Sequence, residues 1–289
     1  MHEKSGKASF GHIYDRQDPR EYFKTLGIMD YRIPDHGQRL FGALVERRRE
    51  AGEDPVNVVD ICCSYGINAA LLKHDLTLDD LYERYCSEEL GSLSTDELAK
   101  GDAAYYAGRA REAAPRVTGL DVAENAVSYA LRAGLLDAGA TEDLEKDRPS
   151  ETLRRAVSGA DLFTVSGGIG YISERTFDAL LGCVDGGSPP WVAVLALRWV
   201  SYEEISGVLD GYGLVTEKLE GRTFEQRSFA DDTEREYVCR ELRGMGVDTE
   251  GKEEDGSYHA EFYLSRPAEQ VSESSVGDLL APVLADEQQ

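Results

Sequence analysis

The sequence predicts an α/β fold in which helices cover both faces of a mostly parallel sheet. Two segments, 56–72 and 117–134, each have the pattern of a short apolar strand, a turn of small residues and an amphipathic helix. A third run, 191–199, is apolar almost throughout, which is typical of a strand in the middle of a parallel sheet. With 289 residues, 41% of them hydrophobic, the chain is long enough to bury a large core.

The first segment places a turn of small residues at the carboxyl end of a strand. The strand ends at Asp60, and the turn that follows contains Cys62, Ser64 and Gly66. Only Tyr65 is large there. In open α/β sheets ligands bind at such a junction, where the helix presents unpaired N–H groups. A slim turn lets a ligand approach the backbone.

The second segment ends its strand at Asp121. A carboxylate only accepts hydrogen bonds, and a ribose diol offers two donors, so an acid at this position suits a nucleoside. The sequence therefore predicts a nucleoside site between the tips of these two strands.

These segments resemble the class I S-adenosylmethionine-dependent methyltransferases over about residues 56–266. Residues 60–66, DICCSYG, stand where the family has an acid and spaced glycines, with Cys62 and Ser64 replacing the first two glycines. Residues 117–130 match the second motif, while TEDLE at 141–145 and ADLFTVSGGIGYI from 160 resemble the later ones. The resemblance implies a Rossmann-like, seven-stranded, mostly parallel sheet. It also implies that S-adenosylmethionine is bound by Asp60, Cys62, Ser64, Tyr65, Gly66, Asp121, Val122, Asp143, Leu144, Ser166 and Gly167.

Residues 1–55 precede this domain, and in the resembled family such an extension is commonly a lid over the cofactor. Tyr14 and Tyr31 are our pocket candidates there, because each stands beside a charged residue in a loop-like context. These aromatic residues could equally pack a leading helix onto the sheet. A helix is expected from about 37 to 51.

A helical insertion is expected at about 75–116, between the first helix and the second strand. Thr77 precedes Asp80 by three residues and Ser94 precedes Glu97 by three, which are helix-capping patterns. The insertion could border the substrate pocket or a dimer interface, or simply cover the sheet.

Arg198 and Trp199 emerge at the carboxyl end of the apolar strand, so we expect them to contact the substrate. Residues 214–229 and 259–264 are expected to form the last two strands, with a helix at about 232–244 between them. Residues 267–289 are polar and acidic apart from a short apolar run, and they are expected to form a mobile or lightly docked tail rather than a domain.

A formal net charge of −24 argues against a nucleic-acid partner, because phosphates would be repelled. No secretory or membrane-spanning run is apparent, so a cytoplasmic protein without a membrane partner is expected. The five cysteines and five histidines show neither disulfide nor metal-ligand spacing, so no metal is expected.

The catalytic residues are the hardest feature to predict from the sequence. Methyl transfer from a sulfonium requires orientation more than a strong base. Tyr171, His36 and Tyr14 are the candidate catalytic residues, and Tyr171 is also a substrate-binding candidate, although it could be an ordinary core aromatic. The loop at 166–171 lacks the lysine of a phosphate-binding P-loop, and no hydrolase triad is apparent.

The sequence thus predicts a methyltransferase acting on a small molecule, possibly in specialised biosynthesis. One alternative is an intramolecular reaction of S-adenosylmethionine on the same fold, and another is a cofactor-binding protein without catalysis. A nicotinamide dehydrogenase is disfavoured because the GxGxxG turn is absent. The residues leave the acceptor and the oligomeric state open.

Overall fold

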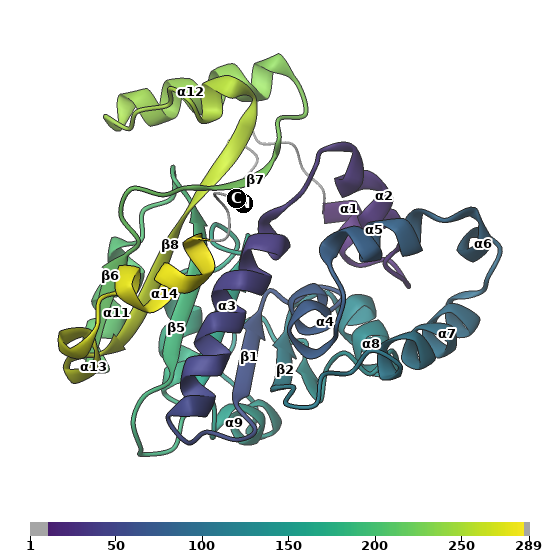
Figure 1. Cartoon of the computed structure of the whole chain (residues 1–289), viewed down its shortest axis with the longest axis horizontal. Coiled ribbons are helices and arrows are strands. Elements are labelled where there is room, and N and C mark those ends of the chain that lie inside the picture. Colours follow the sequence, from purple (N-terminus) through teal and green to yellow (C-terminus); the bar gives the residue numbers. More distant parts are fainter. Residues whose placement is uncertain (1–10, 286–289) are drawn as a thin grey trace.

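A computed structural model describes residues 11–285, which form one mixed sheet with helices on both faces (Figure 1). The strand order is β3-β2-β1-β4-β5-β8-β6, and β7 pairs with β8 as well. The strands are β1 (Asn57–Ile61), β2 (Arg116–Leu120), β3 (Ala138–Ala140), β4 (Leu162–Ser166), β5 (Trp191–Leu197), β6 (Leu214–Lys218), β7 (Phe224–Ser228) and β8 (Ser257–Pro267). Strands β1 to β5 are parallel, whereas β8 runs antiparallel to its three neighbours. The predicted mostly parallel sheet is confirmed.

The strand count is eight rather than the seven expected. Residues 214–229, expected as one strand, form β6 and β7, with Gly221 between them at φ +75°. Both strands pair with the same edge of β8, β6 along its second half and β7 along its first. The eleven residues of β8 therefore pair with three strands. All residues of β5, its neighbour on the other edge, are buried.

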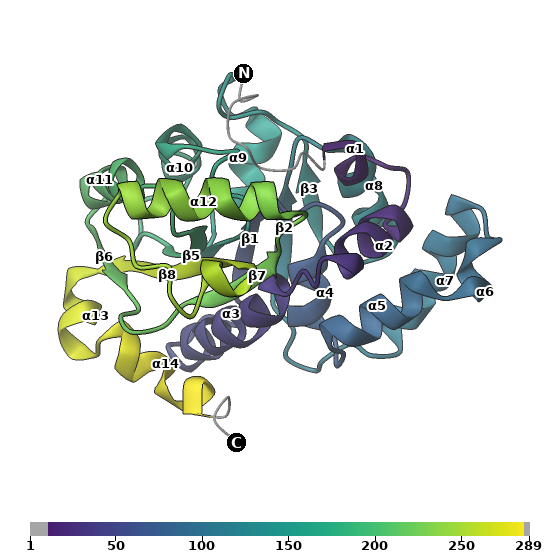
Figure 2. The same cartoon turned by 90° about the horizontal axis from the view of Figure 1, so that it is seen from above.

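The buried apolar residues form two large clusters, one on each face of the sheet. Figure 2 shows the helices on opposite sides of the sheet. One cluster contains buried residues of α3 (Ile33–Glu50), α4 (Ile67–Lys73) and α8 (Glu124–Arg132). The other contains residues of α9 (Glu151–Val157), α10 (Glu174–Leu181) and α11 (Glu203–Gly211). A third, smaller apolar cluster joins α12 (Asp232–Gly244), which precedes η1 (Glu253–Asp255), to the ends of β5 and β8.

The N-terminal region contains α1 (Gly11–Tyr14) and α2 (Arg20–Ile28) before α3. Leu40, Phe41 and Leu44 of α3 are buried in the main core, so α3 covers the sheet. The first turn of α3, through Pro34, borders the ligand cavity together with the segment before it. Residues 1–10 of the expected lid lie outside the described residues.

The expected helical insertion consists of α5 (Leu78–Cys86), α6 (Glu88–Gly91) and α7 (Thr95–Ala107), which extend to one side of the sheet (Figure 1). Both predicted capping boxes are present, at the starts of α5 and α7. The buried carboxylate of Asp102 accepts hydrogen bonds from Arg84, Tyr85 and Tyr129. Because Tyr129 belongs to α8, this cluster ties the insertion to the main domain.

The C-terminal segment, expected to be mobile or lightly docked at 267–289, is docked in its described part. Residues up to 285 form α13 (Ala268–Glu273) and α14 (Val276–Ala285), and α14 packs against α3. Val276, Leu279, Leu280 and Leu284 are buried there. The short apolar run in the tail is thus one face of a docked helix.

Leu280→Ala is expected to lower the free energy of unfolding by about 2–4 kcal/mol, because Leu280 lies on the buried face of α14 and is fully buried. The exposed Glu273→Ala control should change it by less than about 0.5 kcal/mol. Urea denaturation of the two variants measures this difference. Equal stabilities would mean that α14 does not dock in solution.

Candidate functional site

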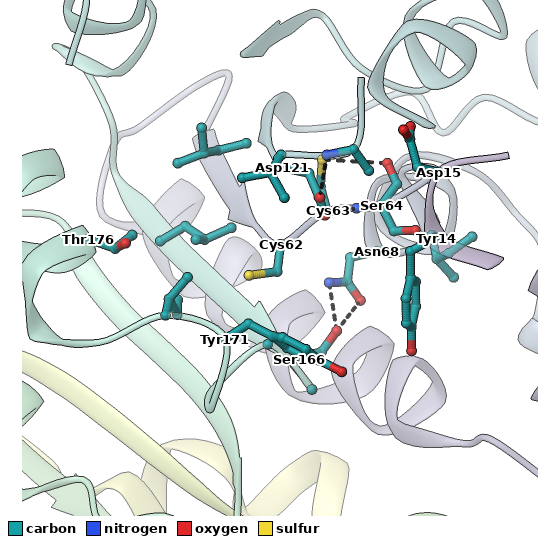
Figure 3. A pocket seen from close by; sticks show the side chains of 18 of the residues that line it. Tyr14, Asp15, Cys62, Cys63, Ser64, Asn68, Asp121, Ser166, Tyr171 and Thr176 are labelled. Carbon is teal, nitrogen blue, oxygen red and sulfur yellow. Dashed lines mark hydrogen bonds between the residues drawn. The ribbon is translucent and has the colours of Figure 1, made fainter. Parts of the chain in front are cut away.

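A cavity of about 490 Å³ opens at the carboxyl ends of β1, β2 and β4, where the strand order reverses direction (Figure 3). This is the point at which open α/β sheets bind ligands. The volume lies within the range of about 300–1,000 Å³ typical of small-molecule sites. The lining residues are Tyr14, Asp15, Tyr22, Tyr31, Pro34, Ile61, Cys62, Cys63, Ser64, Ile67, Asn68, Leu120, Asp121, Val122, Ala123, Glu142, Asp143, Leu144, Glu145, Ser166, Gly167, Gly168, Tyr171, Ile172 and Thr176.

The turn after β1 has three residues with positive φ, at alternate positions. Cys62 has φ +60°, Ser64 has φ +49° and Gly66 has φ +75°. A non-glycine residue in this region costs roughly 1–2 kcal/mol. These are the three positions at which the resembled motif has glycine, so the turn keeps the glycine conformation with two larger residues in it.

Gly66 serves packing rather than direct ligand approach. A Cβ built there would lie 3.2 Å from the Cβ of Ala130 and 3.3 Å from that of Leu135. Gly66 does not line the cavity. Its expected cofactor contact is therefore replaced by a close approach of α4 to α8.

Asp121 joins the tips of β1 and β2. Its Oδ2 accepts a hydrogen bond from the Ser64 N–H at 2.8 Å, and its Oδ1 accepts one from the Ala123 N–H at 2.9 Å (Figure 3). Burial raises the pKa of the carboxyl, and the two backbone N–H groups oppose that effect. The carboxylate lines the cavity, where its remaining lone pairs can accept hydrogen bonds from a ligand.

A buried polar network lies beneath the same turn. The Nδ2 group of Asn68 donates to Asp60 at 2.8 Å and to the Ser166 hydroxyl at 2.9 Å, and the Thr164 hydroxyl also donates to Asp60. Oδ2 of Asp60 and Oγ of Ser64 are buried without a partner among the described residues. Asp60 itself does not line the cavity, so Asn68 and Ser166 stand between it and any ligand.

The loop after β4 is crowded rather than open. A Cβ on Gly168 would lie 2.7 Å from the Cβ of Cys62, and one on Gly167 would lie 2.8 Å from the Tyr31 hydroxyl. Both glycines therefore make room for the side chains of Cys62 and Tyr31.

The loop after β3 forms the wall opposite the N-terminal segment. Leu144 and Asp143 line the cavity, and Asp143 pairs with Lys146 at 2.6 Å. Glu145 accepts hydrogen bonds from Ser173 and Thr176, thereby holding the loop before α10 in place. Burial raises the pKa of Glu145, but these hydrogen bonds outweigh it and hold the pKa below its usual range.

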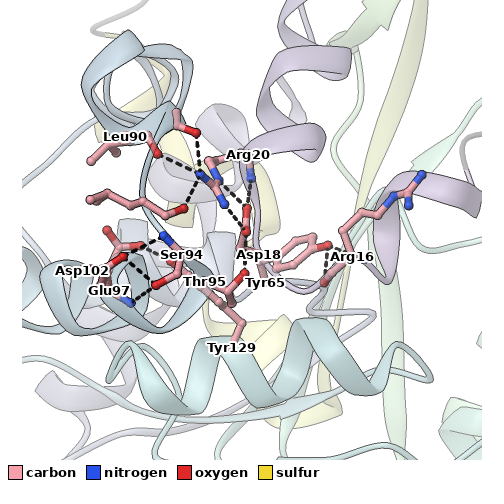
Figure 4. Close-up of polar contacts among 12 residues, drawn as sticks. Arg16, Asp18, Arg20, Tyr65, Leu90, Ser94, Thr95, Glu97, Asp102 and Tyr129 are labelled. Atoms are coloured by element: carbon pink, nitrogen blue, oxygen red, sulfur yellow. Dashed lines mark hydrogen bonds and ion pairs between the residues drawn. The ribbon is translucent and has the colours of Figure 1, made fainter.

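The N-terminal segment closes the other side and is tied down at several points (Figure 4). The Tyr65 hydroxyl accepts from the Arg16 N–H at 2.8 Å and lies 3.1 Å from the Ile13 carbonyl oxygen, to which it can donate. Asp15 accepts from the Asn125 N–H at 2.8 Å. Arg20 donates to the Leu90 carbonyl of the insertion at 2.8 Å. Tyr65, expected to bind the cofactor, instead anchors this segment.

Three further candidates, His36, Arg198 and Trp199, are not among the residues that line the cavity. His36 contacts the Phe224 ring, at a centroid distance of 5.2 Å. Arg198 forms a 2.6 Å ion pair with Glu253, and Trp199 packs on Tyr237 and Tyr258. Arg198 and Trp199 do not line the cavity because α12 and η1 cover the end of β5, where these two side chains lie.

Tyr14, Tyr31, Tyr171, Cys62, Ser64, Asp121, Val122, Asp143, Leu144, Ser166 and Gly167 all line the cavity, although their binding roles remain predictions. Sequence reasoning missed Asn68, whose position as the second residue of α4, directly after the turn of small residues, was a usable signal. It also missed Asp15, Tyr22, Glu142, Glu145 and Thr176, which no local pattern distinguished.

Neither family models nor curated protein sequences match the chain. Among solved structures, it is similar to the N-methyltransferase NodS from Bradyrhizobium japonicum WM9 in complex with S-adenosyl-L-homocysteine, at 12% identity and a TM-score of 0.44, over 92% of this chain and 100% of that one. It is also similar to magnesium protoporphyrin IX methyltransferase (ChlM) from Synechocystis PCC 6803 with bound SAM, at 12% identity and 0.38, over 80% of each chain.

A TehB-like SAM-dependent methyltransferase from Corynebacterium glutamicum matches at 12% identity and 0.38, over 77% of this chain and 86% of that one. All three are methyltransferases by name. Within residues 11–285, no helix is long and apolar enough to cross a membrane, and no three His, Cys, Asp or Glu side chains gather as metal ligands.

The stability of the protein should depend on the ionisation of Asp60. Burial raises its pKa to about 7, well above the roughly 3.9 of an unfolded chain. Between these values the folded state binds more protons, so stability falls as the pH rises. From about pH 5.5 to about pH 7.5, the wild type should lose about 2 kcal/mol more unfolding free energy than Asp60→Asn. Urea denaturation at each pH measures this difference. The same pH dependence of the unfolding free energy in both proteins would contradict the raised pKa.

Removing the Tyr65 hydroxyl should loosen the N-terminal segment. Tyr65→Phe loses hydrogen bonds worth roughly 1–2 kcal/mol, so trypsin should cleave after the exposed Arg16 about tenfold faster. Tyr105→Phe, on the insertion, is the matched control. An unchanged cleavage rate would show that this hydroxyl does not hold the segment.

Proposed function

We propose that the chain is an S-adenosylmethionine-dependent methyltransferase acting on a small molecule. The observation that carries the proposal is the position of Asp121. Its carboxylate is held by the Ser64 N–H at the point where the strand order reverses, and it faces a cavity of about 490 Å³. A carboxylate fixed at the tip of the second strand suits the hydroxyls of a ribose.

The remaining walls fit the other parts of the cofactor. Val122 is 64% exposed although it lines the cavity, and with Leu144 it offers an apolar surface for an adenine ring. The unpartnered Ser64 hydroxyl and the Asn68–Ser166 pair suit the polar amino-acid tail. When bound, S-adenosylmethionine supplies an activated methyl group on a sulfonium.

The charge of the cavity supports this cofactor over a dinucleotide. Five described lining residues are acidic, namely Asp15, Asp121, Glu142, Asp143 and Glu145, and none is Lys, Arg or His. A pyrophosphate would meet these carboxylates without a compensating cation. The Ser64 N–H, which could otherwise bind a phosphate, already donates to Asp121. A sulfonium is instead favoured.

The protein's contribution to methyl transfer is then orientation and exclusion of water. Burial raises the pKa of Tyr14 and of Tyr171, so both hydroxyls stay neutral near pH 7 and can position an acceptor by hydrogen bonding. His36, the other candidate base, is not among the lining residues and packs against the Phe224 ring. Methyl transfer of this kind does not require a strong base.

Asp121→Ala should weaken binding of S-adenosylhomocysteine on the order of a hundredfold, because two charge-assisted hydrogen bonds to the ribose are lost. Isothermal titration calorimetry measures this effect, with the exposed Asp147→Ala as control. Thermal denaturation of each variant shows whether folding is intact. Unchanged affinity in a folded Asp121→Ala protein would remove this residue from the site.

Val122→Ala tests the adenine wall without disturbing the core. Because Val122 is mostly exposed, its truncation should leave the melting temperature near that of the wild type. The loss of roughly 40 Å² of apolar contact, about 1 kcal/mol, should weaken S-adenosylhomocysteine binding about fivefold. The same calorimetric titration would contradict the placement if the affinity did not change.

Product analysis separates methyl transfer from an intramolecular reaction of the cofactor. The pure protein with S-adenosylmethionine alone should form no methylthioadenosine above the spontaneous background. Adding candidate small molecules should release S-adenosylhomocysteine. Rapid methylthioadenosine formation without an acceptor would favour the intramolecular alternative, and binding without turnover on any acceptor would favour the non-catalytic one.

A further inference from the structure

We infer that the methyl acceptor is an amine, bound through a wall of tyrosines at the end of the cavity next to the N-terminal segment. The inference rests on the proposed function and names its substrate class. It depends on two features of the described residues: the tyrosine wall and the absence of basic lining residues.

The tyrosine wall combines two distant parts of the chain. Tyr14, Tyr22 and Tyr31 come from the N-terminal segment, and Tyr171 comes from the loop after β4. The rings of Tyr14 and Tyr22 meet edge to face at 5.9 Å, as do those of Tyr22 and Tyr31 at 6.4 Å. In Figure 3, Tyr14 lies on the opposite side of the cavity from Thr176 of α10.

This arrangement leaves the tyrosine end for the acceptor. Asp121, Val122 and Leu144 account for the ribose and adenine in the proposed function. Tyr171 is 64% exposed, the same value as Val122, so each of these residues has a large open surface that a ligand can cover. The two surfaces suit the two ligands of a group-transfer reaction.

The electrostatics of the wall select a cation. No Lys, Arg or His is among the described lining residues, so a carboxylate or phosphate on the acceptor would have no cationic partner among them. Arg227, whose charge acts on Tyr14 and Tyr171, forms a doubly hydrogen-bonded pair with Glu234 at 2.7 and 3.0 Å. Aromatic rings attract ammonium groups through cation–π interactions.

An amine acceptor does not require a base in the cavity. A neutral amine carries a nucleophilic lone pair once its proton has gone to water, so no cavity residue has to remove it. The nitrogen lone pair then forms the N–CH₃ bond while the S–CH₃ bond breaks and its electrons return to sulfur. The positive charge thus moves from sulfur to nitrogen, where the tyrosines can stabilise it, and the methylated ammonium can release a proton to solvent.

A set of three isosteric probes tests this inference by binding alone. Choline is the cation, 3,3-dimethyl-1-butanol the neutral isostere and 3,3-dimethylbutanoate the anion. Each is titrated by NMR into protein saturated with S-adenosylhomocysteine. Choline should bind at least tenfold more tightly than the neutral probe, and the anion should bind most weakly. Equal or weaker binding of choline would overturn the inference.

Variants locate the preference in the wall. Tyr14→Leu and Tyr171→Leu should each lose most of the preference for choline, whereas Tyr14→Phe and Tyr171→Phe should retain it, because the attraction needs the ring and not the hydroxyl. Tyr105→Leu on the insertion is the control. Retention of the full preference in both leucine variants would also overturn the inference.

S-adenosylhomocysteine binding is measured first, which separates the two proposals. If the protein does not bind it, the proposed function fails and the acceptor inference falls with it. If the protein binds it and shows no preference for the cation, only the acceptor inference fails.

Discussion

The hydrogen bond from the Ser64 N–H to the Asp121 carboxylate holds the site together. It joins the tips of β1 and β2 across 57 residues of chain and lies beside a turn in which Cys62 and Ser64 adopt positive φ. That conformation costs roughly 2–4 kcal/mol for the two residues. A hydrogen bond to a charged group contributes roughly 1.5–3 kcal/mol, so it offsets most of this strain. The remainder is compensated by the buried start of α4.

The rest of the cavity depends on that turn. Because the turn directs the Cys62 side chain toward β4, position 168 can only be glycine. Because the turn also places Tyr65 at the head of α4, its hydroxyl can hold the N-terminal segment over the cavity. The turn therefore shapes the opposite wall and positions the tyrosines that we assign to the acceptor. Replacing two motif glycines has changed the contacts around the turn and left its backbone path in place.

Local signals predicted much of this arrangement. The capping boxes at Thr77 and Ser94 are formed within four residues of chain, and they correctly predicted the starts of α5 and α7. The positions of Asp121 and Val122 followed from the end of an apolar strand. Two of the failures involve partners distant in sequence. Arg198 is covered by η1, 55 residues away, and Leu280 packs near α3, far along the chain, so no pattern around either residue could indicate its surroundings.

The measurement that tests the central claim most directly is a crystal structure of the protein grown with S-adenosylhomocysteine. The account predicts the ribose hydroxyls within hydrogen-bond distance of Asp121, the adenine against Val122 and Leu144, and the Ser64–Asp121 hydrogen bond unchanged. A ligand bound elsewhere, or one that breaks the Ser64–Asp121 bond to reach the turn, would contradict it.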